Sequence, residues 1–196
     1  MSAGPGTCTN RAVPLGSRLG HPCAPPADVL FTWGGECLVQ EGVLTAMEHA
    51  RLTGFWIRPA KARMKKTGEP VPIRQLHVSG WGGVAPPESG IRRVKYCAGC
   101  QSSHYSDITN PEHLIDSRNW DGSDFFKIWP LLGFVFVTER VQQIFKVNGF
   151  KGARFLKTFP TGAVTAAHGL GYGPPPLRWT FPDDRAHEIG DPLGIY

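Results

Sequence analysis

The sharpest chemical motif of the chain is a pair of cysteines three positions apart, in Cys97-Ala98-Gly99-Cys100. Two thiolates at this spacing can share one Zn²⁺, because the glycine lets the turn direct both sulfurs to one side. His104 follows in a Cys-x2-Cys-x3-His pattern and is the third candidate ligand. A closed zinc site needs four ligands, and with no second CxxC the fourth must come through the fold. Two alternatives stay open, a thiol redox pair and two reduced thiols at a turn without metal.

Acidic side chains gather between positions 107 and 124, where only one arginine, Arg118, opposes them. The carboxylates are Asp107, Glu112, Asp116, Asp121 and Asp124. Two of them, Asp121 and Asp124, have a spacing that would suit acid–base catalysis. Asp-Gly is first of all a turn former, however, and the flanking aromatics indicate a turn held on the core. The segment as a whole predicts an acidic patch for a protein partner, with Trp120 and Trp129 as candidate exposed anchors.

Basic side chains gather in two other stretches, beside Trp56 and Trp81. They are Arg58, Lys61, Arg63, Lys65 and Lys66, joined by Arg92, Arg93 and Lys95. Positive charge next to aromatic rings is typical of surfaces that bind a nucleic-acid backbone and stack its bases. A zinc-dependent nucleic-acid-binding protein is therefore the alternative to a protein-binding protein. The opposed acidic and basic patches favour a charged protein partner, because complementary fields steer association.

Composition narrows the class of protein further. With 196 residues, of which 41% are apolar and 11% aromatic, the chain can bury one core. No apolar run is long enough for a signal peptide or a membrane span, and the five cysteines show no disulfide-scaffold spacing, so we expect the cytoplasm and no membrane partner. Phosphate-loop, dinucleotide, nucleophile-elbow, zinc-protease and deaminase motifs are absent, and the sequence predicts no catalytic residues and no enzyme.

Two stretches share a strand-helix-strand pattern, residues 36–57 and residues 134–156. In the second, Thr138 is the expected N-cap, and Val141, Ile144 and Phe145 fall on one helix face. Gly149 followed by Phe150 predicts a Schellman-type helix end, in which the aromatic ring folds back on the last turn. Further strands are expected over 71–79 and 91–96. The pattern predicts an α+β fold with two strand-helix-strand units packed on a mostly antiparallel sheet.

The ends of the chain differ from its middle, because 24 glycines and 18 prolines limit regular structure. We expect a flexible leader over residues 1–27 and a single domain over 28–160, with possible duplicated halves 28–96 and 97–160. Residues 161–196 are expected to form a flexible Gly/Pro-rich tail, because Pro174, Pro175 and Pro176 exclude helix and central strand there.

The order of these motifs resembles the myxobacterial paralogous double-CXXCG family. The pieces are the CxxC of Cys97 and Cys100, the W-x-G-S-D-F-F segment at 120–126, the V-T-E-R run at 137–140, an amphipathic helix and the closing G-x-x-G-x-x-F of 149–155. The resemblance covers about residues 95–160 well and 29–57 loosely. Gln101 stands where the family motif has glycine, and the second CXXCG copy is missing.

Some members of that family are regarded as immunity proteins, which protect a cell from toxins delivered by its kin. The resemblance therefore implies an immunity protein, or antitoxin, that binds a cognate toxin and occludes its active surface. Cys97 and Cys100 match the family motif position by position, but the two departures prevent metal binding from being carried over.

Overall fold

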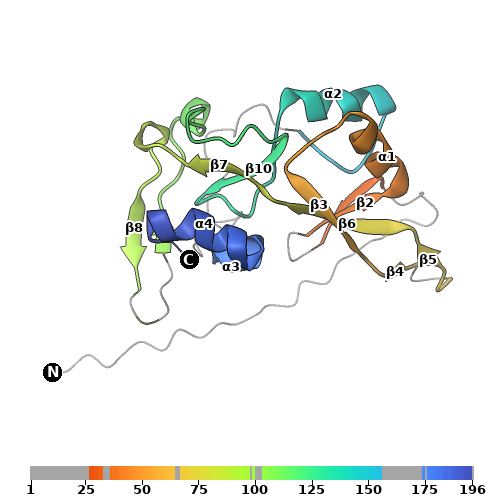
Figure 1. Ribbon diagram of the computed structural model, residues 1–196, viewed down its shortest axis with the longest axis horizontal. Coiled ribbons are helices and arrows are strands. Elements are labelled where there is room, and N and C mark those ends of the chain that lie inside the picture. The colour runs from red at the N-terminus through yellow and green to blue at the C-terminus, as the bar shows by residue number, and fades with distance from the viewer. Residues whose placement is uncertain are drawn as a thin grey trace.

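The computed structural model describes residues 27–32, 36–64, 67–97, 99, 103–155, 174 and 176–195 (Figure 1). The expected leader, residues 1–27, lies outside this part except for its last residue. Of the expected tail, only residue 174 and residues 176–195 are described.

The largest sheet has four antiparallel strands in the order β1-β2-β6-β3. They are β1 (Val29–Phe31), β2 (Cys37–Gln40), β6 (Ile73–Val78) and β3 (Phe55–Pro59). Because side chains alternate between the faces of a sheet, Val39, Leu76 and Val78 point to one buried face. Helices α1 (Glu41–His49) and α2 (Glu139–Asn148) pack on it through Met47 and Phe145. Figure 1 shows these two helices next to each other above the sheet.

A second sheet joins distant parts of the chain in the order β11-β10-β7. Its central strand β10 (Phe125–Trp129) runs antiparallel to β11 (Phe136–Val137) and parallel to β7 (Gly80–Val84). Two hairpins complete the strands: β4 (Ala62–Arg63) with β5 (Pro70–Val71), and β8 (Arg93–Tyr96) with β9 (Ser103–Tyr105). Two short 3-10 turns, η1 (Pro87–Ser89) and η2 (Pro111–His113), lie in the loops. The expected α+β fold with mostly antiparallel strands is confirmed.

Helix α2 follows the local signals of its sequence at the C-terminal end. Gly149 has a φ of 68°, and its N–H bonds to the Lys146 carbonyl while that of Phe150 bonds to the Phe145 carbonyl. These two bonds are the Schellman pair, and the Phe145 and Phe150 rings meet edge to face at 5.6 Å. At the other end Thr138 occupies the N-cap position, but its hydroxyl makes no capping bond.

Two expectations are corrected. The segment after α2 was expected to be a strand, but residues 150–155 contain none, because Gly152 has a φ of 100°, outside the extended region. The expected tail contains two helices, α3 (Leu177–Thr180) and α4 (Asp183–Leu193). Pro176 is the N-cap of α3, so it precedes the helix instead of excluding it, and α4 has two aspartates in its first turn and Gly194 as its left-handed C-cap.

Three hydrophobic clusters form the interior of the described residues. One lies between the largest sheet and helices α1 and α2. Another surrounds Phe126 and Ile128 of β10. The last packs Trp81 and Trp129 against Leu177 and Phe181, so the C-terminal helices contribute directly to the core. None of the helices in the described ranges has both the length and the apolar composition needed to cross a bilayer.

Candidate functional site

The CxxC motif lies in the sequence between β8 and β9, where the two strands of that hairpin are connected. Cys97 directly follows β8 and carries a free, half-buried thiol, and His104 on β9 is the register partner of Lys95. Cys100, the other candidate thiolate, lies outside the described residues. Among the residues that the structure describes, no three His, Cys, Asp or Glu side chains converge on a metal-sized site. Zinc binding by Cys97, Cys100 and His104 stays a prediction.

The five carboxylates expected to form one acidic patch separate into three environments. Asp107 and Glu112 are exposed. Asp116 accepts two hydrogen bonds from the Arg118 guanidinium, at 3.0 and 2.8 Å. These bonds lower the pKa of the Asp116 carboxyl, because they stabilise its charged form. Its charge is therefore matched locally and contributes little to the field of the patch.

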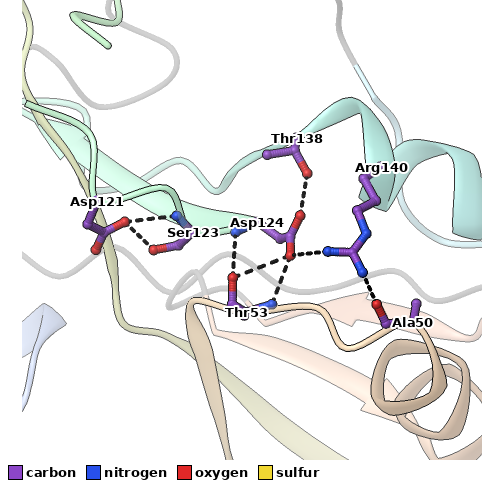
Figure 2. Close-up of polar contacts among 7 residues, drawn as sticks. All are labelled: Ala50, Thr53, Asp121, Ser123, Asp124, Thr138 and Arg140. Carbon is purple, nitrogen blue, oxygen red and sulfur yellow. Dashed lines mark hydrogen bonds and ion pairs between the residues drawn. The ribbon is translucent and has the colours of Figure 1, made fainter. Parts of the chain in front are cut away.

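Asp124 is buried, with 6% of its surface exposed, and joins three segments (Figure 2). Its carboxylate accepts hydrogen bonds from the Thr53 N–H at 3.0 Å and from the Thr138 hydroxyl at 2.8 Å. It also forms an ion pair with Arg140 at 3.2 Å, and the same guanidinium donates to the Ala50 carbonyl. The expectation that Asp124 contacts a partner is wrong, because the polar groups of the protein itself surround the carboxylate.

Asp121 holds the turn before β10. One carboxylate oxygen accepts from both the backbone N–H and the hydroxyl of Ser123, as Figure 2 shows. The other oxygen accepts from the Trp81 N–H at 2.8 Å and pairs with Arg185 of α4 at 3.2 Å. These contacts support the structural interpretation of the Asp-Gly turn, and they leave Asp121 little capacity for a partner.

Neither tryptophan expected as an exposed anchor has that position. Trp129 is 9% exposed, and its indole N–H donates to the Tyr105 hydroxyl at 3.1 Å. Trp120 is half-buried, with its ring 5.4 Å from that of Phe126. Both belong to the interior because β10 and the segment before it run through the middle of the molecule. Among the tryptophans that the structure describes, the exposed one is Trp179 of α3, at 72%.

An acidic surface nevertheless remains around the two 3-10 turns. The side chain of Asn110 donates to the Glu88 carbonyl at 2.8 Å, and the backbone N–H groups of Thr109 and Asn110 both reach the Ser89 carbonyl at 3.1 Å. These bonds join η1 to η2 and place exposed Glu88 near exposed Glu112. We call Glu88 of η1 and Glu112 of η2 the acidic turn pair, and Asp107 is exposed in the loop that precedes η2. No sequence signal indicated Glu88, since only the fold brings it next to the 107–124 segment.

The basic side chains are divided between three strands in different parts of the fold. Arg58 lies near the end of β3 in the largest sheet and Arg63 lies in β4, whereas Arg93 and Lys95 lie in β8. Arg58 stacks on the Trp56 ring at 4.0 Å, and Arg93 lies over Tyr96 at 5.3 Å. Arg58 and Arg93 are thus stacked on rings of their own strands, which weakens the case for a groove in which these two cations would contact nucleic acid.

A cavity of about 410 Å³ opens where the largest sheet meets β10. Strand β2 begins at Cys37 opposite Leu76, so no strand in the described part of the chain pairs with β6 on that side at His77 and Val78. The cavity occupies this position, and Lys127 of β10 and Thr180 of α3 close it from the other side. The sequence analysis missed it, although a lysine inside the apolar run Phe125-Phe126-Lys127-Ile128-Trp129 is a signal.

Burial controls the ionisation of the groups in this cavity. It lowers the pKa of Lys127 to about 8 and raises the pKa of the Cys37 thiol to about 11, since both charged forms lose water. The pKa of His77 is lowered too, first by burial and then by the positive charges of Arg58 and Lys127. His77 Nε2 lies 2.7 Å from the Thr180 carbonyl, which only accepts, so Nε2 carries the proton.

No protein-family model, curated protein or solved structure matches the chain.

Proposed function

We propose that the protein is a non-enzymatic immunity protein that neutralises a cognate toxin by direct contact. The acidic turn pair is the contact surface, and it meets a basic face of the toxin. The observation that carries the proposal is that Glu88 and Glu112, exposed on two turns tied together by hydrogen bonds, and Asp107, exposed in the loop before η2, have no ion-pair partner among the described residues.

An ion pair with a neighbouring residue would have weakened the negative field of such a surface, as the pair with Arg118 does for Asp116. Arg118 lies near Glu88, but its guanidinium is already bound to Asp116. The carboxylates of the acidic turn pair are therefore free to attract a positive partner, and such fields act mainly on association rate and choice of partner. Ile115, 44% exposed beside η2, supplies apolar contact area within the same region.

The experiment is a binding titration between this chain and the product of the neighbouring open reading frame. We expect the double variant Glu88→Gln/Glu112→Gln to weaken binding about tenfold, since two exposed charge pairs together contribute about 1–2 kcal/mol. The wild-type affinity should fall as salt is raised, and the variant should lose part of that salt dependence.

The matched control is Glu48→Gln/Asp184→Asn, which removes the same charge from exposed positions on α1 and α4. Unchanged affinity in this control, together with loss in the test variant, supports the assigned surface. Equal affinity of both variants and the wild type refutes it. Changing Asp116, Asp121 and Asp124 would be a poor test, because Asp116 is already paired with Arg118, and the loss of Asp121 and Asp124 would disrupt the fold.

A further inference from the structure

The cavity beside β6 contains a positive group without a counter-ion. Lys127 is 8% exposed, and its ammonium donates to the Leu132 carbonyl at 2.8 Å and to the Phe134 carbonyl at 2.9 Å. An ammonium has three N–H donors, so one remains. Within the described ranges no carboxylate lies within ion-pair distance of Lys127. A buried charge in this situation is costly until an anion matches it.

The other polar groups of the cavity add to this positive field. Arg58 is held on the Trp56 ring at 4.0 Å, with its guanidinium at the cavity wall. His77 is positioned by its bond to Thr180, and both Arg58 and Lys127 act on it electrostatically. The one carboxylate at the cavity, Glu36, is exposed at the rim and is occupied by Thr32 at 3.0 Å and Gln75 at 3.4 Å. The cavity thus has two cations and one carboxylate, and that carboxylate is already hydrogen-bonded at the rim, so the net charge of the cavity is positive.

The remaining wall is apolar, formed by Leu76, Val78, Leu132 and Val135. A site with convergent polar groups at one end and apolar walls elsewhere is typical of pockets that bind small organic molecules. Its volume of about 410 Å³ lies within the range of such pockets, which is about 300–1,000 Å³.

We propose that this cavity binds a small organic carboxylate, with the anionic group between Lys127 and Arg58 and the apolar body against Leu132 and Val135. The free N–H of Lys127 donates to the carboxylate, and Arg58 closes the site from the solvent side. Such charge-assisted hydrogen bonds contribute about twice as much as neutral ones. The cavity is separate from the acidic turn pair, so a negative result in the test of carboxylate binding would not contradict the proposed immunity function.

The test is calorimetric titration of the full chain with sodium benzoate and, as its neutral counterpart of the same shape, benzamide. We expect saturable benzoate binding at one site and binding of benzamide weaker by about tenfold or more, because it cannot form the charge-assisted bonds. Arg58→Gln, at an exposed position that tolerates substitution, should weaken benzoate about tenfold. Lys127→Met, which keeps the length of the side chain, should abolish the preference for benzoate over benzamide.

The matched control is Arg74→Gln, which removes an exposed arginine from β6 outside the cavity lining. Unchanged benzoate affinity there, with losses in Arg58→Gln and Lys127→Met, supports the proposal. Three results overturn it: no saturable benzoate binding, equal binding of benzoate and benzamide, or equal losses in Arg58→Gln and Arg74→Gln.

The pH dependence gives a second readout. Benzoate affinity should fall as Lys127 loses its proton above pH about 8, the pKa of the free site. The other groups that face Lys127 do not produce this fall, because the pKa of Cys37 is about 11 and that of His77 is lowered; Arg58 is also present in Lys127→Met and so cannot explain a fall that this variant lacks. The fall should be absent in Lys127→Met, and its persistence there would contradict the assignment of Lys127.

Discussion

The backbone N–H of Thr53 donates a 3.0 Å hydrogen bond to the Asp124 carboxylate, across 71 positions of the chain. Thr53 follows α1, and Asp124 directly precedes the buried strand β10. The same carboxylate binds the Thr138 hydroxyl, which explains why Thr138 occupies the N-cap position of α2 without capping it. One acidic side chain thus joins the segment that follows α1, the residue that precedes α2 and the start of β10.

Asp124→Ala should therefore destabilise the fold strongly. Removing the carboxylate leaves Arg140, Thr138 and the Thr53 N–H without their acceptor, and each donor left unsatisfied in a buried place typically costs about 1–3 kcal/mol. Urea denaturation measures the change in the free energy of unfolding. The control is Asp107→Ala, which removes an exposed carboxylate and should change stability by no more than about 0.5 kcal/mol. Similar losses in both variants would contradict the joining role of Asp124.

Sequence reasoning succeeded where the signal was local. The apolar spacing of α2 and its Gly149-Phe150 end depend on neighbours within one helical turn, and the structure has them as predicted. It failed where exposure depends on distant segments. Asp107 and Asp124 look alike in sequence, and only the approach of Thr53 and α2 makes the second one buried.

Helix α4 was missed for a different reason. Its first-turn aspartates and Gly194 are ordinary start and stop signals, but the surrounding prolines and glycines favoured a tail. What makes the segment a packed helix is the apolar contact of Leu177, Phe181 and Ile189 with Trp81 and Trp129, two residues about a hundred and about fifty positions earlier.

Lys127→Met should change the pH dependence of stability. The pKa of Lys127 is about 8 in the folded chain and 10.5 as the ordinary value, so the unfolded chain binds more protons between these limits. The stability of the wild type should therefore rise as pH increases from about 8, and the variant should lack this rise. It should also be at least as stable as the wild type at pH 7, since a buried charge is replaced by an apolar chain.

Cys37 opposes this effect at higher pH. Its thiol has a pKa of about 11 in the fold against 9.0 ordinarily, so the folded chain binds more protons there and stability falls from pH 9 to 11. Thermal unfolding of the wild type and of Lys127→Met at pH 7, 8 and 8.8 isolates Lys127, because the Cys37 effect is present in both proteins. A parallel pH profile in the wild type and Lys127→Met would contradict burial of the ammonium.

Gly80→Ala should prevent normal folding. A Cβ at Gly80 would collide with the backbone oxygen of Phe125 and the side chain of Ser123, which cannot move without disrupting β10. Steric overpacking of this kind costs about 1–3 kcal/mol, and more where the obstacle is backbone. Gly133→Ala is the control, because nothing lies within 4 Å of its Cβ. Soluble yield and urea denaturation should separate the two variants, and equal stabilities would contradict the close approach of β7 to β10.

Trp129→Phe should lower stability without affecting partner binding. The change removes the 3.1 Å bond to Tyr105 and leaves space beside Leu177 and Phe181, which should cost about 1–3 kcal/mol. Trp179→Ala, at the exposed position on the neighbouring helix, should leave the denaturation midpoint nearly unchanged. Urea denaturation of both variants and of the wild type measures the two changes in the free energy of unfolding. A larger loss in Trp179→Ala than in Trp129→Phe would contradict the interior placement of Trp129.

The parallel pairing of β7 with β10 also constrains how the chain acquires its shape during synthesis. Phe126 lies opposite Gly80 in that pair, so a nascent chain that ends before Phe126 lacks the strand with which β7 pairs. Contacts between segments so far apart form late, because the chain must first lose the freedom of the intervening loop. Halting translation before β10 should accordingly leave β7 open to proteases, whereas a halt after β11 should protect it.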